Sequence, residues 1–410
     1  MSKLASSSSP SKFAVHLLKS WGLLALIAAG CARAPVSTPE QAFRDASPPA
    51  LSDDLALEDL SAAIVADVTA LRGSPEKVMR FGPRTITRGE YVTALEKLRH
   101  TLDSSSSVTD KLNYIKDNFS FMEFYGGDRW GEIFLTSYFE PLLAGSKTRT
   151  NKLNYPLYSR PHDLVTIPLA AFSERFKEER ALKARVNGTD VVPYYSRQEI
   201  DGKQRLAGQG LELAWVDPID AFFLHIQGSG TVAFHDGQEA YMTYADKNGH
   251  RYEPVGKYMR GIIGSQKITM QRIEQALRAM TPAERDSYLF KNPSYVFFNK
   301  SEKRAITSLG APATPGRTIA VDPRYAPKGA LALLTFKKPV FSPQYTPSDD
   351  PIAYETVSRL VLDQDSGGAI TGTNRVDLFW GRGDEAKQYA GVIQDSAHIV
   401  YLLPKETFAD

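Results

Sequence analysis

Residues 363–404 read DQDSGGAITGTNRVDLFWGRGDEAKQYAGVIQDSAHIVYLLP, and the fold expected for the C-terminal part of the chain depends on this stretch. Its opening residues, 365–368, predict a turn, because glycine tolerates positive φ and Asp and Ser side chains hydrogen-bond the backbone that follows them. Residues 376–380 predict a strand. Alternation at period two then places Val376, Leu378 and Trp380 on one face, and Arg375, Asp377 and Phe379 on the other. A stiff element therefore presents Asp377 between apolar neighbours.

Asp377 is a candidate acid. A carboxylic acid that donates a proton near neutral pH needs a pKa raised from its reference value of about 3.9, and burial or a second carboxylate raises it. Packing beside Phe379 would bury Asp377, and Asp365 would be the second carboxylate if the turn folds back. Arg375 acts in the opposite sense, because it lies on the same face about 6.6 Å along the strand and favours the ionised form. The alternative is that Asp377 is a solvated strand residue and Asp365 only a turn former.

The first thirty residues differ in kind from the rest of the chain. They carry Lys3, Lys12 and Lys19 without an acidic residue, then an apolar run over 21–30. This pattern is typical of a secretory signal, and the run is shorter than the roughly 20 residues that a membrane-spanning helix needs. The whole chain has 49 basic and 47 acidic residues, so it is near neutral once the signal is removed. A nucleic-acid-binding role therefore lacks an electrostatic basis, and no nucleic-acid partner is expected.

Cys31 is the only cysteine and follows Ala28-Ala29-Gly30 directly. This arrangement resembles the bacterial lipoprotein processing site, in which the cysteine becomes the lipid-bearing N-terminus. Ala32, in place of an acidic residue, then implies the outer membrane and a body that faces the periplasm. The alternative is an incidental thiol in a discarded signal. A single cysteine excludes an internal disulfide.

The rest of the chain divides into a tether, helices, a strand and a small β domain. Residues 31–54, which include several prolines, predict a tether. Helices are expected at 55–71, at 87–99 behind the capping box Thr87-x-x-Glu90, and at 109–118. The segment 133–141 predicts a strand that ends in a proline. Short apolar segments broken by glycine and proline predict a small β domain within 142–300, with helices near 270–280 and after Thr281.

Within this β domain, residues 222–230 are read as a strand whose end carries Gln227 and Ser229. These polar side chains have two interpretations, which composition does not separate. They face a sugar or peptide, or they only form a turn.

Six segments together resemble the membrane-bound lytic transglycosylase A family. The matching segments run in order over residues 138–141, 225–230, 244–250, 292–298, 321–323 and 365–391. The C-terminal portion resembles the three-aspartate domain, with acidic residues at Asp322, Asp365 and Asp377.

The resemblance implies a mainly β protein with accessory helices. A double-psi β-barrel is assembled from residues 55–141 and 301–404, and a second small β-barrel, 142–300, is inserted between its two parts. The groove between the two barrels holds a glycan strand of peptidoglycan. Asp377 is implied as the sole catalytic acid and base, with Asp365 and Asp322 as supporting carboxylates. Tyr138, Glu140, Gln227 and Ser229 are implied as substrate contacts.

The family reaction uses no activated water. The acid protonates the glycosidic oxygen between N-acetylmuramic acid and N-acetylglucosamine, the C6 hydroxyl of the same muramic acid attacks, and a 1,6-anhydro end results. An intramolecular nucleophile is favoured by effective molarity. A glycoside hydrolase would need two carboxylates flanking the bond. No cofactor is implied, and the partners are peptidoglycan, a membrane through the N-terminal lipid, and complexes of cell-wall synthesis or hydrolysis.

Two other classes of function stay open, an aspartic protease and a protein that only binds peptidoglycan. Asp365-Ser366-Gly367 is the tripeptide of aspartic proteases, but those enzymes need two aspartates that share a proton, and the chain has no second such tripeptide. A protease would therefore have to dimerise. The non-enzymatic alternative is a lipoprotein that only binds peptidoglycan. The seven histidines show no metal-ligand spacing.

Overall fold

The structure of the protein is a computed structural model that describes residues 36, 38–127, 129–177, 179, 181–344, 350–368 and 370–405. The predicted signal, 1–30, and the predicted lipidation site, Cys31, lie outside these residues. No helix in the described part is long and apolar enough to cross a membrane.

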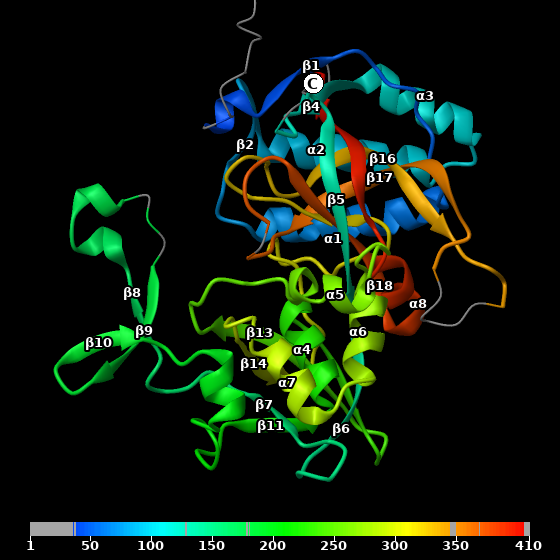
Figure 1. The fold of residues 1–410 in the computed structure, drawn as a ribbon. Helices are drawn as coiled ribbons and strands as arrows, with labels where there is room; N and C mark the ends of the chain where they lie inside the picture. Colours follow the sequence, from blue (N-terminus) through cyan, green and yellow to red (C-terminus); the bar gives the residue numbers. More distant parts are fainter. Residues whose placement is uncertain are drawn as a thin grey trace, which may run out of the picture. The chain divides into compact units, whose positions relative to one another are not determined.

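Six strands form a closed barrel in which every strand pairs with two neighbours, in the order β19, β16, β17, β15, β18 and β5, with β5 returning to β19 (Figure 1). The strands are β5 (Glu132–Glu140), β15 (Thr318–Ala320), β16 (Ala330–Val340), β17 (Ala353–Asp365), β18 (Arg375–Arg382) and β19 (Gln394–Pro404). One strand therefore comes from the first third of the chain and five from its end. The predicted split barrel is confirmed.

Two further strands extend the barrel sheet, because β1 (Phe43–Ala46) pairs with β4 (Phe119–Phe124), which pairs with β19. This corrects the expected tether over 31–54. Within this segment the chain forms a short 3₁₀ turn at Pro39–Gln41 and then the strand β1. After β1, two carboxylates form ion pairs with arginines of the barrel. Asp53 pairs with the buried Arg317 at 2.6 Å, and Asp54 pairs with the buried Arg359 at 2.6 Å. The tether prediction missed these partners because they lie more than 250 residues away in sequence.

Three helices cover this sheet and end close to their predicted positions. They are α1 (Leu57–Gly73), α2 (Arg88–Leu102) and α3 (Val108–Asn118), and the hairpin β2 (Val78–Phe81) and β3 (Arg84–Thr87) connects the first two. The predicted capping box is present, since the Thr87 hydroxyl accepts from the backbone N–H of Glu90 and the Glu90 carboxylate accepts from that of Thr87. Leu60, Ile64 and Leu71 of α1 are fully buried in the core shared with the barrel strands.

Between β5 and β15 the chain forms a second sheet in the order β14, β13, β12, β6, β11 and β7. A bridge between Ser159 and Phe298 brings the two outer strands together, so this barrel is nearly closed. Its strands are β6 (Leu142–Ser146), β7 (Tyr155–Tyr158), β11 (Glu212–Val216), β12 (Gly230–Phe234), β13 (Glu239–Lys247) and β14 (Val296–Ser301). A separate three-stranded sheet projects from it, at the left of Figure 1, and comprises β8 (Val165–Ile167), β9 (Leu182–Asn187) and β10 (Asp190–Pro193).

The predicted strand over residues 222–230 is wrong. Residues Pro218–Gln227 form the helix α4, which places Gln227 at a helix end and Ser229 in the link to β12. Asp217 caps α4 by accepting from two backbone N–H groups, Pro218 occupies its first turn, and Gly228 ends it at φ +83°. These are strong helix boundary signals, but the aromatic run Phe222-Phe223 favoured a strand.

The insert domain contacts the barrel domain through helices at one side. Helices α5 (Arg260–Ile263), α6 (Met270–Arg278) and α7 (Pro282–Leu289) belong to the insert, and α8 (Gly383–Ala390) follows β18. The Met270 N–H donates to the carbonyl of Gly391, and the Gln271 amide donates to the carbonyl of Gln388. Lys387 pairs with Glu274 at 2.8 Å. The two domains are therefore fastened along the α6 and α8 helices.

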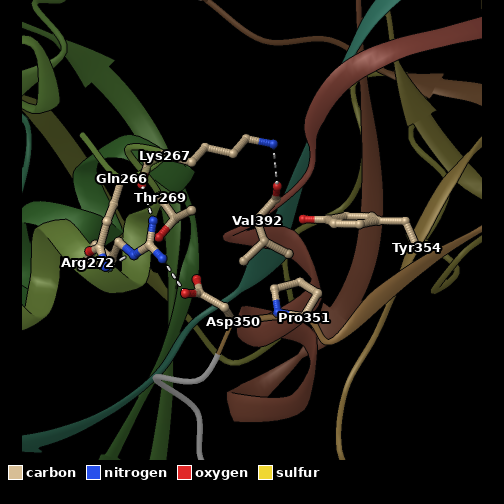
Figure 2. A pocket seen from close by; sticks show the side chains of 8 residues that line it. All are labelled: Gln266, Lys267, Thr269, Arg272, Asp350, Pro351, Tyr354 and Val392. Carbon is tan, nitrogen blue, oxygen red and sulfur yellow. Dashed lines mark hydrogen bonds and ion pairs between the residues drawn. The ribbon is translucent and has the colours of Figure 1, made fainter.

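A cavity of about 350 Å³ lies beside this contact (Figure 2). Lys267 donates to the carbonyl of Val392 across it, and Arg272 pairs with Asp350. Tyr354 lines the opposite wall. Much of its polar lining is already paired across the domain contact, so this cavity belongs to the joint between the domains.

Candidate active site

Three aspartates gather at one end of the barrel because of how β15, β17 and β18 pair. Ala320 of β15 is the register partner of Asp365 on one side and of Asp377 on the other. Asp322 follows two residues after Ala320. Side chains directly opposite across neighbouring strands share a face, so Asp365 and Asp377 lie on the same side of the sheet, about 10 Å apart between Cα atoms.

Asp377 is 9% exposed and lies on β18 between Val376 and Leu378, which are fully buried. Thr136, its register partner on β5, donates its hydroxyl to Asp377 Oδ1. Arg375 donates from Nε to Oδ1 at 3.0 Å and from Nη2 to Oδ2 at 3.1 Å. Asp377 is therefore a nearly buried carboxylate with a bidentate guanidinium partner, as the alternation of the strand predicts for Arg375.

Asp365 is the last residue of β17 and not the first residue of a turn. Tyr138 of β5 donates its hydroxyl to Asp365 Oδ2 at 2.9 Å. The backbone N–H groups of Ser308 and Ser366 both donate to Oδ1, at 3.0 and 2.9 Å. Burial raises the pKa of the Tyr138 phenol well above its usual value, and the negative charge of Asp365 and its hydrogen bond add to this, with a smaller contribution from Asp377. Tyr138 is thus a neutral donor whose phenol lies near both aspartates.

Asp322 holds the loop that leads into β18. Its Oδ2 accepts from the backbone N–H of Gly372 at 2.8 Å, and Arg324 donates to both carboxylate oxygens, from Nη2 at 2.6 Å to Oδ2. Burial by itself would raise the pKa of Asp322, but the hydrogen bonds from Arg324 and Gly372 outweigh it and lower the pKa below its usual value. Asp322 is therefore an ionised anchor.

Lys328 ties the ends of β15 and β17 together. Its ammonium group donates to the carbonyls of Val321 and Asp365 and to Asp363 Oδ1, with Nζ to oxygen distances of 2.8, 2.5 and 2.5 Å. Tyr401 donates to the other oxygen of Asp363 at 2.9 Å. Burial raises the pKa of Asp363 to about 6, against the opposing effects of Lys328 and Tyr401. Sequence reasoning missed this cluster because its members are spread over three segments.

The other residues predicted to contact substrate, Glu140, Gln227 and Ser229, do not join the aspartates. Gln227 accepts from the backbone N–H of Phe139 at 3.2 Å, and Glu140 accepts from the Thr231 hydroxyl at 2.7 Å. Both contacts join β5 to the insert domain. Ser229 is partly buried after the end of α4. The structure therefore brings Tyr138 to the aspartates, whereas the described contacts of Gln227 and Glu140 are structural, and a substrate role for them stays a prediction.

Thr136 was missed by sequence reasoning. The signal available was the spacing of Thr136 and Tyr138, two residues apart on a predicted strand and hence on the same face. His225 is buried with Nδ1 2.9 Å from Arg197, and burial lowers the pKa of its imidazole, followed by the effect of Arg197. Among the described residues, no group of three or more His, Cys, Asp or Glu side chains could hold a metal ion.

Comparison with known families and relatives agrees with this architecture. Residues 134–299 match the family described as the MltA specific insert domain, and residues 317–403 match the 3D domain. The membrane-bound lytic murein transglycosylase A of Vibrio cholerae is 30% identical over 271 residues, which cover 65% of this chain and 64% of that protein. The protein of the same name from Escherichia coli K12 is 28% identical over 274 residues, with the same two shares.

The chain thus spans 64% of the length of these two curated relatives. Among solved structures, a membrane-bound lytic murein transglycosylase from Agrobacterium tumefaciens superposes with a TM-score of 0.69 at 30% identity. The match covers 88% of this chain and 98% of that one. Both family matches fall on the two barrels described above, and the chain belongs to the membrane-bound lytic murein transglycosylase A family.

Proposed function

We propose that the protein is a peptidoglycan lytic transglycosylase. It cleaves the β-1,4 bond between N-acetylmuramic acid and N-acetylglucosamine and leaves a 1,6-anhydro-N-acetylmuramic acid end. Asp377 is the catalytic acid and base, and Asp365 and Asp322 support it. Family membership supports this reading, and the contacts of the three aspartates support it independently.

One observation carries the proposal: Asp365 and Asp322 are tied to backbone N–H groups of the fold, whereas the hydrogen bonds described for Asp377 come from the side chains of Thr136 and Arg375. Asp365 accepts three hydrogen bonds over its two oxygens, from Tyr138, Ser308 and Ser366. Asp322 likewise accepts from Arg324 and from the Gly372 backbone. A hydrolase needs a second carboxylate that is free to activate water or attack the sugar. This arrangement favours a reaction that uses a single carboxyl group.

The reaction then proceeds without water. Protonated Asp377 gives its proton to the glycosidic oxygen, and the bond between that oxygen and C1 of the muramic acid breaks with its electron pair going to oxygen. The C6 hydroxyl of the same sugar forms a bond to C1, and its proton passes to the Asp377 carboxylate. Thr136 orients that carboxylate by donating to Oδ1. General acid–base catalysis of this kind contributes about 10²- to 10⁴-fold in rate.

Digestion of purified sacculi followed by mass spectrometry tests the proposal. Anhydro-muropeptides, lighter by one water than the hydrolysis products, are the expected result. Reducing muramic acid ends would indicate a hydrolase. An absence of soluble products together with pelleting of the protein with sacculi would indicate a protein that only binds peptidoglycan.

The proposal extends to location. Processing and lipidation at Cys31 would attach the body to a membrane, and Ala32 favours the outer membrane with the body in the periplasm. The names of the relatives, which describe membrane-bound proteins, support attachment. Residues 55–141 and 301–404 would then act on peptidoglycan from the membrane side.

A further inference from the structure

Phe134 is an exposed aromatic residue on the strand that carries part of the candidate active site. Its neighbours Ile133 and Leu135 are 2% and 1% exposed and pack in the barrel core, whereas Phe134 is 45% exposed. Alternation along β5 places Thr136 on the same outward face as Phe134. Thr136 is the residue that donates to Asp377. The ring of Phe134 therefore belongs to the face of the barrel that carries the proposed acid.

The strand register shows which side chains surround this ring. β5 lies between β18 and β19, and register partners on neighbouring strands share a face. The outward side chains of these three strands form two rows, Asp377, Thr136 and Gln394 in one row and Arg375, Phe134 and Ser396 in the other. Strands lie about 4.8 Å apart and the rows about 6.6 Å apart. Phe134 and Gln394 are thus both within about 10 Å of Asp377 between Cα atoms.

Phe134 and Gln394 are the members of these rows that the fold does not use. In the part of the chain that the structure describes, the Phe134 ring pairs with no other aromatic ring, and the exposed Gln394 amide has no hydrogen-bond partner. Ser396, by contrast, donates to Glu132 at 2.9 Å. A single exposed apolar side chain is common and needs no function. Phe134 differs because it lies beside the proposed acid and diagonal to an unpaired amide.

We propose that Phe134 and Gln394 form a sugar-binding subsite beside Asp377. The subsite takes an N-acetylhexosamine of the glycan strand, which then runs across β18, β5 and β19. The ring of Phe134 packs on the C–H face of the sugar, and the amide of Gln394 pairs with the N-acetyl group. This inference rests on the proposed function and adds the position of a sugar that does not itself react.

An N-acetylhexosamine fits these two groups chemically. One face of a pyranose ring is made of C–H groups, and an aromatic side chain offers a large apolar surface to cover it. The N-acetyl group is a neutral amide with one donor and one acceptor, and the amide of Gln394 supplies both complements. Ligand sites typically combine an apolar surface with a few polar groups that fix orientation. Diagonal neighbours on adjacent strands lie about 7 to 8 Å apart, so Phe134 and Gln394 can reach one sugar.

The place of this subsite also gives it a role in the reaction. Asp377 protonates an oxygen that joins two sugars, so a sugar held nearby helps to place that oxygen against the acid. The contacts with Phe134 and Gln394 involve no reacting atom and are equal in the ground state and the transition state. Such contacts lower KM and leave kcat unchanged. Both residues are therefore substrate-binding residues.

Replacing the ring should leave the fold intact. The backbone N–H of Phe134 donates to the carbonyl of Asn374 at 2.7 Å, and this contact does not depend on the side chain. Phe172, 72% exposed between β8 and β9, is the matched control, because it is an exposed phenylalanine outside the barrel. Urea unfolding of each variant checks that the free energy of unfolding stays close to that of the wild type.

Binding is measured by calorimetry with the β-1,4-linked hexasaccharide of N-acetylglucosamine, in an Asp377→Asn background that prevents cleavage. Phe134→Ala should bind about tenfold more weakly, the scale of uncovering part of an aromatic side chain. Gln394→Ala should bind about fivefold more weakly, the scale of one neutral hydrogen bond. Phe172→Ala should bind as the background protein does.

A spectroscopic readout reports contact with the sugar directly. Phe134→Trp keeps an aromatic surface and should retain binding, and its fluorescence emission should shift to shorter wavelength when the hexasaccharide covers the indole. Phe172→Trp should show no shift beyond that of the background protein. On sacculi, with Asp377 intact, Phe134→Ala should raise KM for release of anhydro-muropeptides and keep kcat. A merely structural role for Phe134 would lower kcat instead.

The outcomes separate the subsite from the proposed function. Unchanged affinity of Phe134→Ala for the hexasaccharide would overturn the subsite, whatever products the wild type releases, and would indicate that the ring contacts another protein. Reducing ends, or no cleavage of sacculi by the wild type, would overturn the transglycosylase, while the binding measurement would still decide the subsite.

Discussion

Asp365 and Asp377 are both register partners of Ala320, on the two strands that flank β15. This places the two aspartates two strand spacings apart, about 10 Å between Cα atoms. Each has its own set of donors, Tyr138, Ser308 and Ser366 for Asp365, and Thr136 and Arg375 for Asp377. Substituting one of them should therefore leave the contacts of the other in place, which makes their roles separable.

Replacing Asp377 with Asn should abolish most of the activity. Asn keeps the size and an acceptor for Thr136 but has no carboxylic proton, so release of anhydro-muropeptides should fall about 10²- to 10⁴-fold. Co-sedimentation with sacculi should be retained. Asp365→Asn, the matched control, should reduce activity less, because it changes the contacts with Tyr138, Ser308 and Ser366 and leaves those of Asp377 in place. Wild-type product release by Asp377→Asn would reverse these assignments.

Replacing Tyr138 with Phe removes the hydroxyl that donates to Asp365 Oδ2 and leaves the rest of the ring, which packs 5.1 Å from Phe379 between centroids. A carboxylate that loses one of its donors costs about 1 to 3 kcal/mol. We expect a lower free energy of unfolding in urea and a lower kcat. Tyr241→Phe on β13, whose hydroxyl lies 3.5 Å from Glu239 at the surface, is the control and should change neither. Equal stability of the two variants would contradict a hydrogen bond at Asp365.

Asp322 should act on the loop before β18. Asp322→Ala removes the acceptor of the Gly372 N–H, and amide hydrogen exchange at Gly372 should become about tenfold faster, as expected for loss of one hydrogen bond. Asp322→Asn keeps an acceptor oxygen and should preserve most of the protection. Unchanged exchange in the Ala variant would show that other contacts hold the loop.

The raised pKa of Asp363 predicts that the free energy of unfolding depends on pH. Its pKa is raised to about 6 in the folded protein, chiefly by burial, and is about 3.9 in an unfolded chain. The folded state therefore binds more protons than the unfolded state between these values, and the stability contributed by this group falls as pH rises from about 4 to 6. The size of the fall is on the order of 3 kcal/mol. Above about pH 6 the contribution is constant.

The measurement is urea unfolding at pH 4 and pH 6.5 for the wild type and Asp363→Asn. The advantage of the wild type over the variant should shrink between the two values, because only the wild type loses the contribution of Asp363. The variant keeps an oxygen that can accept from Lys328 but carries no charge at either pH, so it lacks the titration of Asp363. A difference between the proteins that stays constant with pH would show that Asp363 is ionised throughout.

Cys31→Ser tests the proposed anchor. The variant should fail to incorporate a labelled fatty acid and should leave the membrane fraction, while the purified body keeps its activity. Labelling of the Ser variant would exclude lipid attachment at Cys31.

The sequence predicted the strands with the clearest alternation and the helices with caps. It predicted the placement of Arg375 and Asp377 on one face, because that follows from a local period of two. It failed for α4, where the apolar run 222–226 resembles a strand and the deciding signals, Asp217 and Gly228, stand at its ends. The capping geometry outweighed the intrinsic preference of the aromatic residues.

Partners distant in sequence could not be predicted. Lys328 contacts two segments, and nothing in its own neighbourhood distinguishes it from a surface lysine. Asp53 and Asp54 were assigned to a tether because the prolines before them suggested one, whereas their partners are Arg317 and Arg359. These contacts are properties of the closed barrel, and a linear pattern does not contain them.

The place of β19 in the barrel has a consequence for how the chain reaches its native state. This last strand lies between β4 and β16 and also pairs with β5, so the ring closes only when residues 394–404 are available. The insert domain, which is one continuous segment, has no such requirement. Contacts between distant segments form slowly. During synthesis from the N-terminus, the insert can therefore fold first, and the barrel that carries the three aspartates closes only after residues 394–404 have been made.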